Sequence, residues 1–445
     1  MYDLVLKNGN VLLPNKSIEK VDIGIKRNKI LQIGSISKKM GKIILNIDNL
    51  IAIPGVIDTQ VHFREPGLTH KEDILHGTMG AVLGGVTTIF EMPNTLPPTI
   101  DKKSLNFKLS VAKQSSHCNY SFFIGASTKK ISSLRKLENL EGCCGVKIFV
   151  GSSTGDLLVK DDTNIEKILR VAKRPVAIHS EDEYRLDTRK EIFAKKNISV
   201  FDHPKIRDEL VAINSTNRLL KIAKKLKRRI HILHISTADE IEIIKRFKNH
   251  ATCEVTPQHL FFSSPSCYKK LGTLAQMNPP IRNTNHRKGL WKGLKDRVVD
   301  VIGSDHAPHT IKEKNKPYPN SPSGMSGVQT LLPIMLDFVN KKKLTISHLS
   351  ELVSENPCKI YNVSNKGFIK KGYDADITII DLNKNFKITN RWIASKCKWT
   401  PYNDYIVKGM PIHTIVSGKI AMKNNKIVKS INGKEVKFNN SFSQN

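Results

Sequence analysis

Between Pro54 and about Asn356, short apolar runs rich in β-branched residues alternate with longer, lysine-rich stretches. Stretches such as Lys103–Gln114, Asn164–Ala172 and Asp208–Lys225 have the length of helices. Strands that alternate with helices indicate parallel βαβ units, and the spacing here is roughly that of a βα repeat. We therefore predict an α/β fold built on a TIM-like (β/α)8 barrel. The apolar runs are Val56–Asp58, Val86–Glu91, Val146–Lys147, Pro175–Ile178, Ile230–Leu233, Ala251–Val255 and Val298–Gly303.

The two ends of the chain have a different pattern. Short runs of alternating polar and apolar residues occur before residue 54 and return from Gly367, which is typical of small antiparallel strands. We expect the two ends to form halves of one β-sandwich beside the barrel. The runs are Asp3–Lys7, Val21–Lys26, Ile30–Ile33, Ile43–Ile47, Asp376–Asp381 and Ile412–Lys423. The predicted parts are the N-terminal half-sandwich (1–53), the barrel (54–356), the C-terminal half-sandwich (357–430) and a polar tail (431–445).

Composition excludes several classes of protein. The net charge is +32, but the lysines are spread along the whole chain and aromatic residues make up only 6%, so we predict no nucleic-acid partner. No apolar run approaches the roughly 20 residues that cross a bilayer, and Met1–Asn10 does not resemble a signal peptide, which favours a cytoplasmic protein. The seven cysteines are scattered without CxxC spacing, which argues against a disulfide framework or a thiolate zinc site.

Four polar residues follow apolar runs in the same topological position: His62, His179, His234 and Asp305. In a barrel, the carboxyl ends of the strands gather on one face, where active sites lie. Imidazoles and a carboxylate without thiolates suit a catalytic Zn²⁺ or a similar divalent ion. One histidine at a strand end is ordinary, but this recurrence predicts a shared metal site. We interpret His231 as structural and His259 as a supporting or core residue.

Several segments resemble the signatures of dihydroorotases, a group within the amidohydrolase superfamily. They are Asp58–Gly67 with His70–Asp73, Met92–Thr95, Met277–Arg282 and Ser304–His309, and the resemblance extends to Ala375–Ile377. Related hydantoinases, dihydropyrimidinases and allantoinases share the barrel, but in general they lack the combination of Arg64, Asn94 and an Asp-His-Ala-Pro-His segment. The resemblance implies reversible interconversion of (S)-dihydroorotate and N-carbamoyl-L-aspartate in pyrimidine biosynthesis.

The resemblance also implies a metal site with one or two divalent ions per chain, which we expect to be Zn²⁺. Its ligands would be His62, Lys147, His179, His234 and Asp305, with Lys147 carboxylated to form the bridge. One position departs from the family pattern. The usual Asp-x-His-x-His has Gln60 in place of its first histidine, and an amide oxygen is a poorer zinc ligand than imidazole. We therefore expect one ion to be held more weakly, or the ion preference to shift.

The remaining roles concern proton transfer and substrate binding. Asp305 is the predicted catalytic residue, moving a proton between the attacking water and the ring nitrogen. Arg64 would bind the substrate carboxylate as a bidentate fork, and Asn94 and His309 would add hydrogen bonds. Asn278 is expected to contact the pyrimidine ring. Gly324, in the turn Pro322–Gly324, would allow close backbone approach to the ring amide. The alternative is that Ser321–Gly327 is a lid without direct contact.

Two other functions stay open at this point. Another cyclic amidase, an allantoinase or a dihydropyrimidinase, is disfavoured because an uncharged ring gives the Arg64 guanidinium nothing to bind. A non-catalytic partner of aspartate transcarbamoylase is suggested only by Gln60, and the other ligands are all present. We expect a homo-oligomer that acts on a small-molecule substrate, with aspartate transcarbamoylase as the candidate protein partner.

Overall fold

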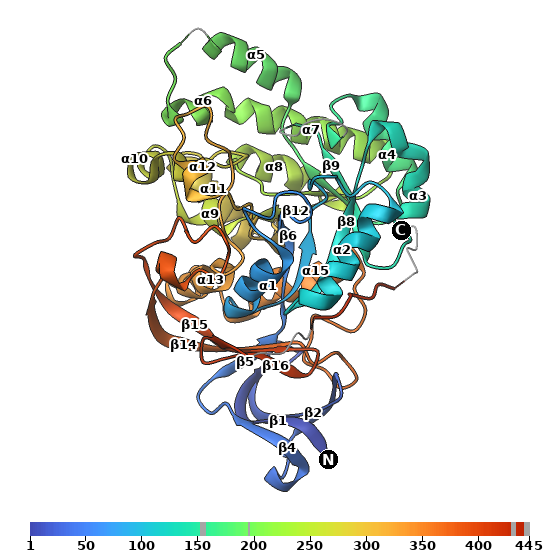
Figure 1. Cartoon of the computed structure of the whole chain (residues 1–445), viewed down its shortest axis with the longest axis vertical. Helices are drawn as coiled ribbons and strands as arrows, with labels where there is room; N and C mark the ends of the chain where they lie inside the picture. The colour runs from blue at the N-terminus through green and yellow to red at the C-terminus, as the bar shows by residue number, and fades with distance from the viewer. Residues whose placement is uncertain (152–156, 195, 429–432, 440–445) are drawn as a thin grey trace.

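The computed structural model describes residues 1–151, 157–194, 196–428 and 433–439. Its centre is a sheet of eight parallel strands in sequential order from β6 to β13 (Figure 1). Val61 pairs with His306, and the His62 amide donates to the His306 carbonyl at 2.7 Å, which closes the sheet into a barrel. The predicted barrel is confirmed. Its strands are β6 (Val56–Val61), β7 (Val86–Glu91), β8 (Asn119–Gly125), β9 (Cys143–Phe149), β10 (Val176–His179), β11 (Ile230–Ile232), β12 (Ala251–Val255) and β13 (Val301–Ile302).

Helices cover the outside of the barrel, as βαβ connections require. Their starts follow local sequence signals, because Asp101 and Thr237 form capping boxes at α2 and α8. The helices are α1 (Ile74–Leu83), α2 (Lys102–Ser115), α3 (Leu134–Leu137), α4 (Asp162–Val171), α5 (Glu183–Ala194), α6 (His203–Ile206), α7 (Glu209–Lys225), α8 (Ala238–Arg246), α9 (Pro257–Phe261), α10 (Ser266–Leu271), α11 (Thr284–Lys295), α12 (Ile311–Lys314), α13 (Leu331–Asn340), α14 (Ile346–Ser350) and α15 (Asn356–Tyr361). No helix in the described part of the chain is long and apolar enough to span a membrane.

The second sheet combines both ends of the chain, as predicted. Its strands run in the order β17-β16-β15-β14-β5-β1-β2-β3, with β4 also paired to β1, and β14 joins the two halves by pairing antiparallel to β5. Most pairs are antiparallel, although β4 and β5 run parallel to β1. The strands are β1 (Tyr2–Leu12), β2 (Ile18–Lys26), β3 (Lys29–Gly34), β4 (Gly41–Asn46), β5 (Ile51–Pro54), β14 (Ile377–Lys387), β15 (Ile406–Val416), β16 (Lys419–Lys423) and β17 (Lys426–Ile427).

One predicted strand is two strands. The run Ile412–Lys423 is divided between β15 and β16 by a turn at Ser417 and Gly418, where φ is 49° and 78°. Glycine adopts a positive φ without steric cost, which permits this tight reversal. The interruption is a single glycine in an otherwise alternating run, so the pattern alone did not divide the run.

The chain returns to the barrel after the sandwich. Residues 433–439 belong to the segment predicted as a polar tail, yet Glu435 pairs with Tyr120, and Val436 is only 1% exposed. Val436 and Phe438 share an apolar cluster with Phe90 of β7 and other barrel residues. This part of the tail therefore packs onto the barrel. The rest of the predicted tail, 431–432 and 440–445, lies outside the described residues.

Candidate active site

The predicted ligands gather at the carboxyl ends of the barrel strands. His62 follows β6, Lys147 lies near the end of β9, His179 ends β10, His234 follows β11, and Asp305 follows β13. All five side chains are buried. His234 and Asp305 have positive φ angles of 35° and 44°, so the chain turns sharply at both residues as it leaves its strand.

Asp305 and His62 form the first of two pairs. The Asp305 Oδ1 accepts a hydrogen bond from Gln60 Nε2 at 2.9 Å and lies 3.2 Å from His62 Nε2. On its other side, His62 Nδ1 lies 2.7 Å from Asn94 Oδ1, which can only accept, so Nδ1 carries the proton. Burial lowers the pKa of His62 and favours this neutral form. A lone pair on Nε2 therefore faces a carboxylate oxygen, which is an arrangement that suits a cation between them.

His179 and His234 form the second pair. His179 Nδ1 lies 2.9 Å from His234 Nε2, and His179 Nε2 lies 2.8 Å from the carboxylate of Glu181. The carboxylate fixes the proton on Nε2 and leaves a lone pair on Nδ1. Burial, with help from the charges of His179 and Lys147, places the pKa of His234 well below its ordinary value. Two imidazoles that face each other in this way are suited to divalent metal ions.

Lys147 is the unusual member of the site. It is 1% exposed, and its Nζ has no hydrogen-bond partner among the described residues. Burial lowers its pKa to about 7, against the opposing effect of Asp305 and Glu254. A sizeable fraction of the amine is therefore neutral at neutral pH, which is the form that reacts with CO₂.

The two pairs and Lys147 together fit a metal centre. Within the described parts of the chain, no three His, Cys, Asp or Glu side chains converge by themselves into a metal site. A complete metal site therefore needs two further ligands. Lys147 Nζ and Gln60 Oε1 are both buried, and neither atom has a hydrogen-bond partner among the described residues. A carboxylated Lys147 would supply anionic oxygens, and Gln60 would supply one neutral oxygen.

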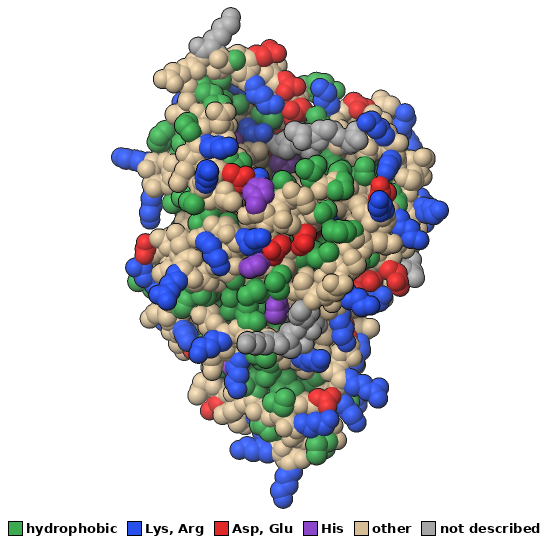
Figure 2. All heavy atoms as spheres, in the orientation of Figure 1, with side chains coloured by type: hydrophobic (Ala, Val, Ile, Leu, Met, Phe, Trp, Pro, Cys, Tyr) green, Lys and Arg blue, Asp and Glu red, His purple; other side chains and the backbone are tan. Residues whose placement is uncertain are grey.

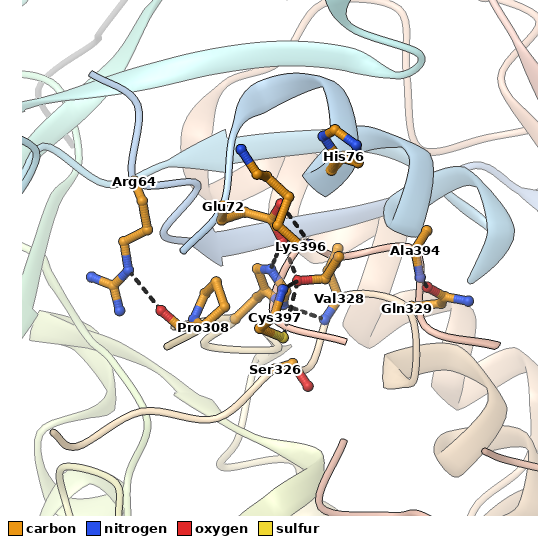
Figure 3. Close-up of polar contacts among 12 residues, drawn as sticks. Arg64, Glu72, His76, Pro308, Ser326, Val328, Gln329, Ala394, Lys396 and Cys397 are labelled. Carbon is orange, nitrogen blue, oxygen red and sulfur yellow. Dashed lines mark hydrogen bonds and ion pairs between the residues drawn. The ribbon is translucent and has the colours of Figure 1, made fainter. Parts of the chain in front are cut away.

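Arg64 lies beside this centre as a buried cation. Its Nε donates to the Pro308 carbonyl at 3.2 Å, as Figure 3 shows, and its Nη2 lies 3.3 Å from His309 Nε2. Burial lowers the pKa of Arg64 to about 10, so the group remains charged at neutral pH. Among the described residues no carboxylate lies within ion-pair distance of Arg64. A buried, unpaired guanidinium is costly in a protein without an anionic ligand.

Gly324 and Asn278 lie on two neighbouring loops. Gly324 has φ +142°, and an added Cβ would lie 2.3 Å from the Ala307 carbonyl oxygen, so only glycine fits. Its amide donates to the Gln276 carbonyl at 2.9 Å and is therefore already hydrogen-bonded. Asn278 is half-buried, and its Oδ1 has no partner within the described residues.

The family model described as amidohydrolase family matches residues 51–421. The chain belongs to the amidohydrolase family. Members of this family usually bind divalent metals, in agreement with the paired ligands above. The dihydroorotase of Methanosphaera stadtmanae is 36% identical over 439 residues, covering 96% of this amidohydrolase and 98% of that protein. The dihydroorotase of Pyrococcus horikoshii is 34% identical over 437 residues, covering 98% and 95%.

Solved structures of cyclic amidases share the fold of this amidohydrolase. The L-hydantoinase (dihydropyrimidinase) from Arthrobacter aurescens superposes with a TM-score of 0.93 at 25% identity, covering 98% of this chain and 100% of that chain. The dihydropyrimidinase from Brevibacillus agri gives a TM-score of 0.86 at 21% identity, covering 97% of each. The latter likeness supports the fold alone, whereas the sequence relatives point to dihydroorotases.

Two histidines of the amidohydrolase lie outside the two pairs of predicted ligands. His231 Nδ1 lies 2.8 Å from the Thr252 hydroxyl, and its ring packs on Tyr361. His259 Nε2 lies 3.1 Å from the Pro279 carbonyl, next to Asn278, so this ring supports the Asn278 loop.

Sequence reasoning missed a buried lysine that joins two loops. Lys314 is fully buried and donates to the Gln276 carbonyl at 3.0 Å and the Pro322 carbonyl at 2.9 Å. The Gln276 side chain in turn binds Ser321 and Ser323. The loops that carry Asn278 and Gly324 are thereby fixed to one another. Nothing in the local sequence of Lys314 signals this role, because its helix is only four residues long.

Proposed function

We propose that this amidohydrolase is a dihydroorotase that interconverts (S)-dihydroorotate and N-carbamoyl-L-aspartate in pyrimidine biosynthesis. The observation that carries the proposal is Arg64, a buried and unpaired cation beside the two ligand pairs. Dihydroorotate and carbamoyl aspartate both carry a carboxylate outside the reacting amide, whereas uncharged hydantoin and dihydrouracil rings do not. The curated relatives named dihydroorotase, matched over nearly their full length, support the same choice.

The residues that would hold two divalent ions, for which Zn²⁺ is our candidate, are the pair His62 and Asp305, the pair His179 and His234, and a carboxylated Lys147 that bridges them. Gln60 would assist the first ion. When bound, such ions polarise the ring carbonyl and lower the pKa of water towards about 7.

The side chains supply binding and proton transfer. Arg64 donates a bidentate pair of hydrogen bonds to the substrate carboxylate, and Asn94 and His309 complete that pocket. Asp305 accepts the proton of the attacking water and delivers it to the departing ring nitrogen. In the direction of ring closure, Asp305 protonates the leaving hydroxyl instead. Its position beside His62 Nε2 keeps the carboxylate at the reacting end of the pocket.

The proposal is tested by turnover after reconstitution with zinc, manganese or cobalt in the presence of bicarbonate. We expect hydrolysis of dihydroorotate, with little hydrolysis of allantoin or dihydrouracil. Preferred turnover of either neutral substrate would identify a different cyclic amidase. The absence of turnover with every metal would favour a non-catalytic partner of aspartate transcarbamoylase.

Replacing Arg64 by Met should raise KM for dihydroorotate by roughly 10- to 100-fold, because a charge-assisted bidentate contact contributes about 1.5–3 kcal/mol. Steady-state kinetics with dihydroorotate measure this effect. Any residual hydrolysis of dihydrouracil serves as the internal control and should not weaken, since that ring has no carboxylate for Arg64. An unchanged KM for dihydroorotate would show that Arg64 does not bind the carboxylate.

Gln60 should make one metal ion labile. Protein purified without added zinc is expected to retain fewer than two tightly bound ions per chain, because a neutral amide oxygen is a poor zinc ligand. The Gln60→His variant should retain more metal, since an imidazole replaces the amide and the Asp305 oxygen is released from its hydrogen bond. Elemental analysis measures both. Two tightly held zinc ions in the wild-type chain would contradict the prediction.

We also propose that the enzyme assembles as a homo-oligomer, with aspartate transcarbamoylase as its protein partner. Size-exclusion chromatography of the chain alone, and then with that enzyme, tests both statements. Elution as a monomer in the two runs would reject them.

A further inference from the structure

The segment His70–Asp73 matches the dihydroorotase signature, but the proposed function gives it no role. Two adjacent residues of this segment contact the loop Asp305–His309. Glu72 contacts His306, and Lys71 contacts His309. The two contacts have opposite chemistry, because a carboxylate only accepts hydrogen bonds and an ammonium only donates them.

Glu72 is a buried carboxylate surrounded by donors. It is 0% exposed, its Oε2 lies 3.2 Å from His306 Nε2, and the same oxygen accepts from the Ser395 hydroxyl. Its Oε1 accepts from the amides of Asp73 at 3.1 Å and Lys396 at 3.3 Å. Figure 3 shows Glu72 directed toward Lys396 and Cys397, with Val328 close by. The carboxylate therefore joins the α1 region, the Asp305 loop and the segment around Lys396.

The contacts of His306 define its tautomer. Its Nδ1 accepts from the Gly327 amide at 3.0 Å, so the proton is on Nε2, which donates to Glu72. The His306 carbonyl accepts from the His62 amide at the seam of the barrel. Asp305, the preceding residue, has a positive φ that is unfavourable for any residue other than glycine. Fixing the His306 ring thus holds the neighbouring Asp305 in place opposite His62.

Lys71 fixes the second imidazole. Its Nζ lies 3.2 Å from His309 Nδ1 and 3.1 Å from the Glu313 carboxylate. Since the ammonium donates to Nδ1, the proton of His309 is on Nε2, which donates to the Ser323 carbonyl at 3.1 Å. The Arg64 Nη2 therefore cannot donate to that nitrogen, and its hydrogens stay available for an anion. Burial, followed by the charges of Arg64 and Lys71, lowers the pKa of His309 and keeps it neutral.

We infer that Lys71 and Glu72 are positioning residues with separate effects: Glu72 acts through His306 on the reacting end of the pocket, and Lys71 acts through His309 on the carboxylate end. This inference rests on the proposed function, because it uses the roles given there to Asp305 and His309. A residue that aligns a group needed only in the transition state changes kcat, whereas one that supports ground-state binding changes KM.

The test compares each variant with a matched control. Glu72→Gln is paired with Glu138→Gln, because Glu138 is also 0% exposed and accepts from the amides of Lys173 and Arg174 at 2.9 Å, just before β10 and so at the opposite end of the barrel. Lys71→Met is paired with Glu313→Gln, which removes the charged partner of Lys71 but leaves its hydrogen bond to His309.

We expect Glu72→Gln to lower kcat for dihydroorotate by about 10- to 100-fold, the usual effect of a residue that supports a metal-site ligand, with KM changed less than about twofold. Lys71→Met should raise KM by about tenfold and change kcat less than about threefold. Both controls should keep wild-type kinetics. Equal losses of kcat in the Glu72→Gln and Glu138→Gln variants, or parallel changes of kcat and KM in both test variants, would overturn the inference.

A second pair of variants covers the case in which Glu72→Gln does not fold. His306→Gln keeps an amide donor near the position of Nε2, whereas His306→Asn is too short to reach Glu72. The inference expects a higher kcat for His306→Gln than for His306→Asn, and the reverse order would reject it. ¹⁵N spectra of labelled histidine should also show a weaker hydrogen bond from His306 Nε2 in Glu72→Gln and an unchanged one in Glu138→Gln. Wild-type protein without dihydroorotate turnover would instead reject the proposed function, which separates the two failures.

Discussion

Replacement of Asp305 by Asn is expected to lower kcat for dihydroorotate by roughly 10³-fold while the protein stays folded. General acid–base groups contribute about 10²- to 10⁴-fold, and Asp305 is also a proposed metal ligand. The asparagine oxygen still accepts the hydrogen bond from Gln60 Nε2, so the local geometry is retained. An amide oxygen does not take up a proton at neutral pH, so the transfer between water and ring nitrogen fails. Steady-state kinetics with fully metal-loaded protein measure the loss.

The matched control for Asp305→Asn is Asp22→Asn in the sandwich. Asp22 is also buried, and it accepts hydrogen bonds from Lys7 and from the amides of Asn8 and Ile36. That variant should lose stability and keep its turnover per folded molecule. Wild-type turnover in Asp305→Asn would eliminate the carboxylate as the proton carrier.

The second large effect is expected at Lys147. Lys147→Met should reduce turnover by more than the roughly 10- to 100-fold loss caused by removing a supporting residue of a metal site, because a proposed bridging ligand disappears. The same change should raise the thermal stability of the metal-free protein at pH 7. The Lys147 Nζ is buried without a hydrogen-bond partner among the described residues, so methionine fills the same space without burying a charge.

The pH dependence of this stability difference gives an independent check. The folded-state pKa of Lys147 is about 7, below the ordinary value of 10.5, so between these values the unfolded chain binds more protons than the folded one. The stability of metal-free wild-type protein relative to Lys147→Met should therefore rise with pH in this window, by up to about 1.4 kcal/mol per unit. Urea unfolding at several pH values measures it. A flat difference would mean that the amine is not desolvated.

Much of the fold was predictable because periodicity and chain order are local signals. The run Ala251–Val255 is β12, and Lys103–Gln114 lies within α2. Strand β8 was not among the predicted runs, since it ends in Gly125 and no ligand follows it. Of the predicted strand Val298–Gly303, only the two residues of β13 form a strand in the structure. The barrel is closed beyond β13, where the backbone of His306 pairs with Val61.

The site was predictable only as a set of residue types at strand ends. The sequence placed His179 and His234 on one barrel face, but it did not show that their nitrogens point at each other. The contact between Glu72 and His306 joins residues separated by most of the barrel, and no periodicity encodes which atoms meet. Sequence did not distinguish a buried Lys147 from a surface lysine either, since only the folded barrel removes water from it.

The pairing of β5 with β14 has a consequence for how the molecule is made. Ile51–Pro54 leads directly into the first barrel strand, yet its antiparallel neighbour Ile377–Ile380 is synthesised only after the last barrel strand. During translation, the edge of β5 in the N-terminal half of the sandwich therefore stays unpaired until the whole barrel has been synthesised. The second sheet is thus completed only at the end of synthesis, and a chain that ended before Ile377 would leave the edge of β5 without its partner strand.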